Sequence, residues 1–107
     1  MKKEVLAVKI KNAVHKDGKD YYEATKGDWR AARDRVRKVE YVIGVLDKEV
    51  VCVYKPLVWE TVEKNGRKRQ RFEGKEVDKS TFNTFKDMQD DILKGFGVGA
   101  SISYKQI

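Results

Sequence analysis

Apolar residues alternate with polar ones near the start of the chain. Within residues 5–10, Leu6, Val8 and Ile10 share one face of an extended segment, and part of the segment is β-branched. This period of two is typical of a strand, so we predict a first strand here. Residues 11–20 are polar and contain Gly18, which predicts a loop.

The spacing of apolar residues changes after Asp28. Trp29, Ala32, Val36 and Val39 recur close to the period of a helix, and Asp28 is a residue type that caps a first turn. We therefore predict a short helix that begins after Asp28.

Two segments rich in Val, Ile, Tyr and Trp follow, at residues 41–46 and 50–62. Asp47-Lys48-Glu49 separates them, a three-residue connection that suits a hairpin. Pro56 has no backbone N–H, so we expect the second strand to bend or to lie at a sheet edge there. Asn65-Gly66 favours positive φ and predicts a reversal into a further antiparallel strand at residues 67–73.

The last third of the chain predicts a helix and then a strand. Ser80 is placed to cap a helix, and Gly95 is placed to end it. Four apolar residues share one face of that helix: Phe82, Phe85, Met88 and Ile92. Residues 100–104 predict a short final strand.

This order of elements predicts one α+β domain over residues 1–107. We expect a small, mostly antiparallel sheet, curled or closed into a barrel, with one short and one longer helix. The length supports one hydrophobic core, and 40% hydrophobic residues suffice to form it.

Composition narrows the expected environment. Charged residues interrupt the apolar N-terminal stretch almost at once, and no segment reaches the roughly 20 apolar residues of a membrane span. Cys52 is the only cysteine, which excludes an internal disulfide. We therefore expect a cytoplasmic protein without a membrane partner.

The charge of +7 favours anionic partners. Half of the 24 Lys and Arg residues fall in two clusters: Lys26, Arg30, Arg33, Arg35, Arg37 and Lys38, and then Lys64, Arg67, Lys68, Arg69, Arg71 and Lys75. Aromatic residues interleave with both clusters. An aromatic ring beside guanidinium groups can stack on a base while the cations meet phosphate.

Six residues are candidates for such a site: Trp29, Arg30, Arg33, Trp59, Arg69 and Arg71. Each has a structural alternative. Trp29 and Trp59 could fill the core instead of stacking on a ligand. The alternating arginines at 67, 69 and 71 would share one strand face, where they either oppose an anion or protect a sheet edge from aggregation.

Catalytic patterns are sparse. His15 and Cys52 are the only His and Cys, which excludes a structural zinc site, and His15 has no evident catalytic partner. Glu73-Gly74-Lys75, with Glu60 or Glu63 on the preceding strand, is similar to the acidic pair and lysine of restriction-type nucleases. The Asp that usually precedes this pair is missing, and the sequence predicts no cofactor.

The segment Thr25-Lys26-Gly27-Asp28-Trp29 fits a T-[RK]-G-x-W pattern. With the arginines that follow, the hairpin through Tyr54 and the sequence Arg71-Phe72-Glu73-Gly74-Lys75, it resembles a family of small bacterial and phage domains. We associate this family with PUA-like barrels such as the EVE and ASCH groups. The resemblance covers residues 25–75, with a looser match of the later helix and the final strand. It implies a pocket for RNA or a modified base near Trp29, Arg30, Arg33 and Trp59.

These patterns leave three hypotheses open. The first is a nucleic-acid or nucleotide-binding module without enzymatic activity, in which arginines contact phosphate and Trp29 or Trp59 stacks on a base. The second is a small phage-type inhibitor or sponge that captures a host protein or a nucleotide signal. The third is a metal-dependent nuclease that uses Glu73 and Lys75.

Overall fold

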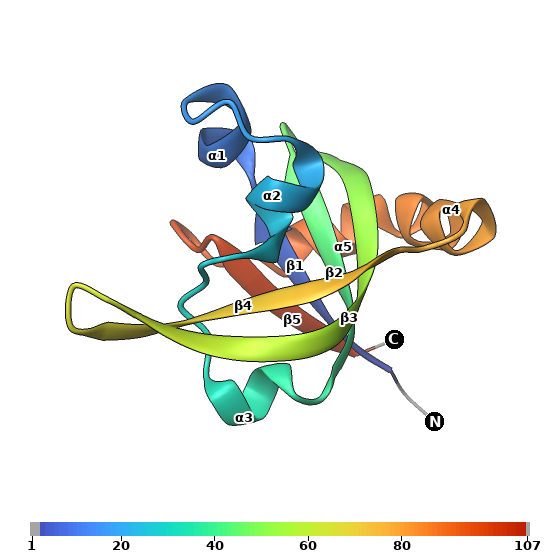
Figure 1. Ribbon diagram of the computed structural model, residues 1–107. Helices are drawn as coiled ribbons and strands as arrows, with labels where there is room; N and C mark the ends of the chain where they lie inside the picture. Colours follow the sequence, from blue (N-terminus) through green and yellow to red (C-terminus); the bar gives the residue numbers. More distant parts are fainter. Residues whose placement is uncertain (1–2, 107) are drawn as a thin grey trace.

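Five strands form one mixed sheet in the computed structural model, which describes residues 3–106 (Figure 1). The strands of this part of the chain are β1 (Glu4–Lys9), β2 (Val39–Leu46), β3 (Glu49–Lys64), β4 (Arg67–Glu76) and β5 (Ile102–Gln106). Their order is β4-β3-β2-β1-β5, and only the β1–β2 pairing is parallel. The predicted α+β, mostly antiparallel sheet is confirmed. Closure of the sheet into a barrel is not confirmed, because β4 and β5 do not pair and remain the two edges of the sheet.

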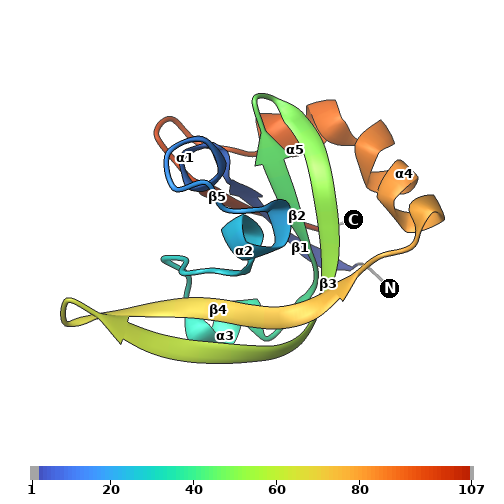
Figure 2. The same cartoon turned by 45° about the horizontal axis from the view of Figure 1, so that its top comes forward.

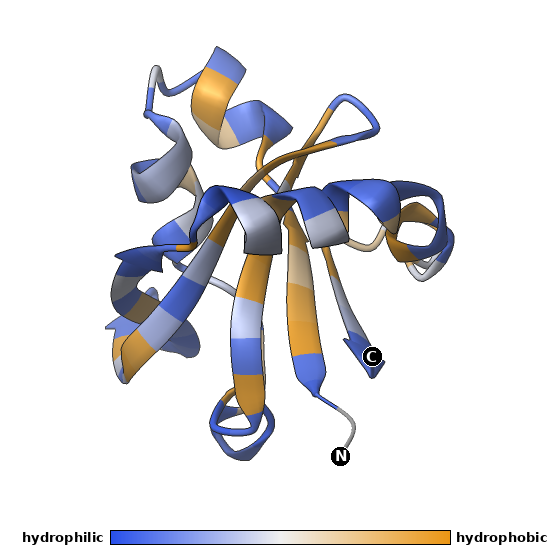
Figure 3. Ribbon diagram, turned by 90° about the vertical axis from the view of Figure 1, so that its right-hand side faces the viewer, coloured by the Kyte–Doolittle hydropathy of each residue, from blue (hydrophilic) through white to orange (hydrophobic). Residues whose placement is uncertain are grey.

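Short helices cover both faces of the sheet (Figures 2 and 3). The described residues contain α1 (Lys11–His15), α2 (Tyr21–Lys26), α3 (Arg33–Val36), α4 (Lys79–Asp87) and α5 (Gln89–Lys94). A buried apolar cluster lies on each face of the sheet, and alternate residues of β1 contribute to the two. Leu6 and Val8 pack with Ala24 of α2 on one face. Val5 and Ala7 belong to the cluster on the other face, under α4 and α5. None of the helices in residues 3–106 has the length and apolar character that crossing a membrane requires.

The predicted loop at residues 11–20 is wrong in its first half, where α1 forms one turn. Helix α2 was not predicted. Asp20 caps it by accepting a hydrogen bond from the Glu23 backbone N–H (2.8 Å). Thr25 on α2 is fully buried and lies 3.2 Å from the Cys52 sulfur. Burial raises the pKa of the Cys52 thiol, consistent with a neutral core residue.

The predicted helix after Asp28 is also largely wrong. Residues 28–32 form no helix, and only the single turn of α3 is helical. The Trp29 backbone pairs with Gln70 of β4 through two hydrogen bonds of 2.8 and 2.9 Å, so strand pairing overrides the local helical pattern. Asp28 does not cap a helix, because its carboxylate pairs with Arg71 instead.

Both hairpins are confirmed, with one correction. Leu46 pairs with Glu49, so the first turn contains two residues, Asp47 and Lys48, both with positive φ, and not three. Asn65 and Gly66 form the second turn as predicted, at φ 53° and 76°. The register of β3 shifts after Pro56, and β3 pairs with β2 only as far as Tyr54. The outer part of the β3–β4 hairpin therefore extends as an arm, which Figure 2 shows.

The predicted C-terminal helix is divided at Met88 into α4 and α5. Asp78, and not Ser80, caps α4 by accepting a hydrogen bond from the Thr81 N–H (2.8 Å). The apolar face is otherwise as expected, since Phe85 and Ile92 are buried, and α5 ends before Gly95. The final strand lies two residues later than predicted.

Gly44 allows α2 to lie against the sheet. A Cβ atom at this position of β2 would overlap the Cys52 sulfur and lie 2.8 Å from the Thr25 hydroxyl. We expect Gly44→Ala to lower the free energy of unfolding by about 1–3 kcal/mol, the range for overfilling a packed core. Urea denaturation measures this loss.

Cys52→Ala tests the cause of that loss. The double variant Gly44→Ala/Cys52→Ala should lose less stability than the sum of the two single losses, because the overlapping sulfur is gone. Gly97→Ala is the matched control, since the nearest heavy atom to its new Cβ lies at 3.9 Å. A Gly44→Ala variant as stable as this control would contradict the packing described.

Candidate functional site

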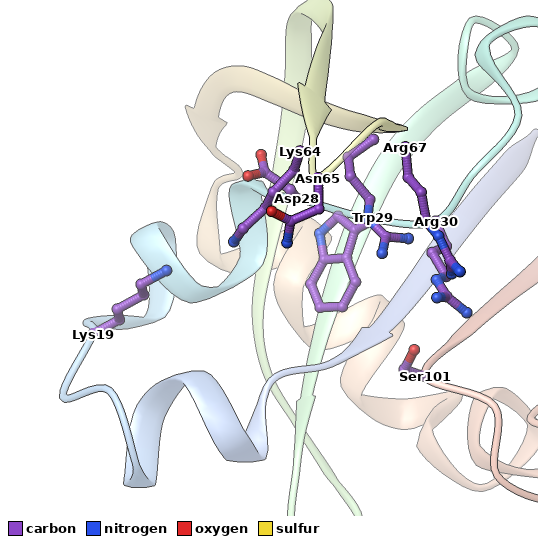
Figure 4. Close-up of a pocket in the computed structure, with 9 residues that line it drawn as sticks. Lys19, Asp28, Trp29, Arg30, Lys64, Asn65, Arg67 and Ser101 are labelled. Atoms are coloured by element: carbon purple, nitrogen blue, oxygen red, sulfur yellow. The ribbon is translucent and has the colours of Figure 1, made fainter.

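A cleft of about 670 Å³ opens beside Trp29, and we call it the Trp29 cleft (Figure 4). Its size lies within the usual range for ligand pockets. Its walls come from the connection between α1 and α2, from the segment after α2, from the outer part of the β3–β4 hairpin and from the residue that precedes β5. The lining residues are Lys19, Asp28, Trp29, Arg30, Lys64, Asn65, Arg67, Arg69 and Ser101.

Three hydrogen bonds fix Trp29 in this cleft. Its backbone N–H and C=O bond to Gln70, and its indole Nε1 donates to the backbone oxygen of Thr25 at 2.7 Å. The side chain is partly buried, packs against the core residues that include Phe72, and also lines the cleft. Core and cleft, which the sequence presented as alternatives for Trp29, are therefore combined in one residue.

Gly27 and Asp28 hold the segment against β4. A Cβ at Gly27 would lie 2.5 Å from the Arg71 Cβ, so this close approach requires glycine. The Asp28 Oδ1 lies 3.1 Å from the Arg71 Nε. Arg71, which the sequence suggested as a phosphate contact, lines a separate small pocket next to Asp28 and not the Trp29 cleft.

The Trp29 cleft is strongly cationic. Five of its lining residues are basic and one is acidic, and that one, Asp28, already pairs with Arg71. Within residues 3–106, no carboxylate lies within 4.0 Å of the charged groups of the five basic residues: Lys19, Arg30, Lys64, Arg67 and Arg69. These cations are therefore available to an anionic ligand.

A second cleft of about 330 Å³ lies beside Trp59, and we call it the Trp59 cleft. It is lined by Arg33, Arg37, Trp59, Glu60, Thr61 and Gln70. Trp59 is partly buried and packs on Phe72, with their ring centroids 5.2 Å apart. Gln70 is only 3% exposed, and its side-chain oxygen accepts a hydrogen bond from the Thr61 hydroxyl at 2.9 Å.

The six predicted site residues therefore lie at three different positions in the structure. Trp29, Arg30 and Arg69 meet in the Trp29 cleft, Arg33 and Trp59 meet in the Trp59 cleft, and Arg71 pairs with Asp28. Lys64 and Arg67 belong to the second basic cluster of the sequence but were not among the predicted site residues. The Asn65-Gly66 turn could have shown that these two residues lie at the same hairpin tip. Nothing in the local sequence identifies Lys19, Gln70 or Ser101 as lining residues.

The residues of the nuclease hypothesis lie on the paired strands β3 and β4, where Glu60 pairs with Arg71, two residues before Glu73. Glu60, Glu63, Glu73 and Lys75 are exposed. The described part of the chain holds no group of three or more His, Cys, Asp and Glu side chains that could bind a metal ion. His15 lies 3.3 Å from Asp47, whereas the buried Cys52 contacts Thr25.

Comparison with protein-family models, curated proteins and solved structures finds no significant match to this chain. The resemblance to PUA-like barrels therefore stays a prediction, and the site is interpreted from its own residues.

Gly27→Ala should displace Trp29, because the new Cβ forces the segment away from Arg71. We expect a loss of about 1–3 kcal/mol in the free energy of unfolding. With Trp59 replaced by Phe, Trp29 is the only tryptophan, and its fluorescence should shift to longer wavelength as it gains contact with water. The open-position variant Gly97→Ala serves as control, and an unshifted Trp29 spectrum in Gly27→Ala would refute the proposed role of Gly27.

Proposed function

We propose that this chain binds nucleic acid or a nucleotide in the Trp29 cleft, with Arg30, Arg67 and Arg69 contacting phosphate and Trp29 stacking on a base. The observation that carries the proposal is a cleft with five basic residues, all without a carboxylate partner among residues 3–106, around a fixed and partly exposed indole ring. The proposal concerns binding alone and includes no reaction.

The arrangement of charge supports a phosphate ligand. Cations gathered in one cleft repel each other, and an anion that enters relieves this repulsion. The three arginines can each offer two parallel N–H groups to phosphate oxygens, a geometry that Lys cannot provide. The five cations of the Trp29 cleft come from three separate parts of the sequence: Lys19, Arg30 and residues 64–69. Folding therefore brings together charges that are far apart in the sequence.

The position of Trp29 supports a planar ligand group next to the phosphate. Stacking of a base on an aromatic ring contributes about 1–3 kcal/mol and tolerates any base. The bond from Nε1 to the Thr25 oxygen and the backbone pairing with Gln70 already hold the ring in place. Ligand binding therefore costs little conformational entropy at the Trp29 side chain, which favours affinity.

Replacing Arg67 and Arg69 together by Ala should weaken binding of a fluorescently labelled single-stranded oligonucleotide by about one to two orders of magnitude. Anisotropy titrations at several salt concentrations measure this change. The affinity of the unmodified protein should fall as salt rises, and the double variant should reduce the slope of log K against log salt by about 1 for each lost phosphate contact.

Lys79→Ala/Lys94→Ala is the matched control, because it removes the same charge from exposed residues of α4 and α5. It should leave the affinity close to that of the unmodified protein. Equal weakening by both double variants would show general charge attraction without a site. Affinity that does not depend on salt would refute phosphate recognition, and capture of one protein without any oligonucleotide binding would favour the inhibitor hypothesis.

A further inference from the structure

The proposed function does not involve the Trp59 cleft. Gln70 connects the two clefts, since its backbone pairs with Trp29 and its side chain lines the Trp59 cleft. On the other side, Gln70 pairs with Thr61 of β3, and Trp59 lies two residues from Thr61 on the same strand. Paired residues and residues two apart project from the same face of a sheet, so Trp29, Gln70, Thr61 and Trp59 share one face.

The separation of the two tryptophans follows from this register. From Trp29 to Trp59 the path crosses two strand spacings and advances two residues along β3. With strands about 4.8 Å apart and a rise of about 3.4 Å per residue, the two backbone positions lie roughly 12 Å apart. That distance corresponds to about three to four stacked nucleotides at 3.4 Å each.

The chemistry of the Trp59 cleft suits an unpaired base. The side-chain oxygen of Gln70 accepts a hydrogen bond from the Thr61 hydroxyl. The amide N–H groups of Gln70 therefore point away from Thr61. Trp59 offers a partly exposed ring beside this nearly buried amide. Hydrogen bonding to a base edge next to an aromatic surface is how proteins hold bases that have left a stack.

Cations lie along the chain that joins the clefts. Arg30 lines the first cleft, and the second is lined by Arg33, the first residue of α3, and by Arg37, which follows α3 directly. Arg33 and Arg37 are exposed, and within residues 3–106 no carboxylate lies within 4.0 Å of their guanidinium groups. A phosphate backbone that passes from one cleft to the other would therefore meet a cation at both ends.

We infer that the ligand is a single strand of nucleic acid that occupies both clefts, with one base on Trp29 and another, about three to four nucleotides along, in the Trp59 cleft. This inference rests on the proposed function of the Trp29 cleft and adds the class of ligand. A free mononucleotide fills only one cleft. A duplex keeps its bases paired and cannot place them on two separate aromatic rings.

The test is a length series of labelled oligothymidylates and oligouridylates, from two to eight nucleotides, titrated by anisotropy at constant salt. Affinity should rise about tenfold or more between two nucleotides and four to five, when the second base reaches the Trp59 cleft, and should change little with further length. A duplex of eight base pairs should bind more weakly than either of its strands. The two series also distinguish DNA from RNA.

Arg33→Ala/Arg37→Ala should abolish the length step, so that the ratio of affinities for six and two nucleotides falls to near 1. Both arginines are exposed, so the variant should remain folded. Trp59→Leu is a second variant, which removes stacking but keeps an apolar side chain against Phe72. Lys79→Ala/Lys94→Ala, with the same loss of charge, should retain the full step.

The outcomes separate this inference from the proposal on which it rests. Equal affinity at all lengths, a step that survives in Arg33→Ala/Arg37→Ala and Trp59→Leu, or a duplex that binds as well as its strands would overturn the two-cleft ligand. In each of those cases, sensitivity to Arg67→Ala/Arg69→Ala would leave the Trp29 cleft established. If no oligonucleotide binds at any length, the proposed function itself fails.

Discussion

Two backbone hydrogen bonds between Trp29 and Gln70 attach the segment after α2 to the outer edge of β4. Both clefts depend on this pairing, because it places the indole of Trp29 beside the β3–β4 hairpin and leaves Gln70 between the two tryptophans. It also covers part of an edge strand that would otherwise offer free backbone groups to another chain. Gly27 is required for the same approach, since a side chain there would meet Arg71.

The other end of this segment is held at the opposite side of the sheet. The Arg35 Nε of α3 lies 2.6 Å from a carboxylate oxygen of Glu4 on β1, and its guanidinium lies 4.5 Å from the ring centroid of Tyr104 on β5. The segment therefore runs from β4 to the β1–β5 side of the curled sheet. Side chains and one isolated bridge make this connection, and β4 and β5 do not pair with each other, so the sheet stays open. The Trp29 cleft lies between the β3–β4 hairpin and Ser101.

The parts of the fold that local sequence predicts are those with local causes. Alternating β-branched residues identify the strands, and Asn65-Gly66 identifies its turn because few other pairs accept positive φ at both positions. The helix expected after Asp28 fails because its competitor, the pairing with Gln70, is distant in the sequence. The same limit applies to the site: the basic clusters and both tryptophans were visible, but the pairing of Arg71 with Asp28 and the position of Ser101 arise only from the folded chain.

The two indole N–H signals in a ¹⁵N–¹H correlation spectrum test the central claim most directly, because one belongs to each cleft. The Trp29 signal should exchange slowly with water, since its N–H donates to the Thr25 oxygen at 2.7 Å. On titration with a six-nucleotide single strand, both indole signals should shift and saturate together. Binding that moves only backbone signals of α4 and α5, with both indole signals unchanged, would contradict the account.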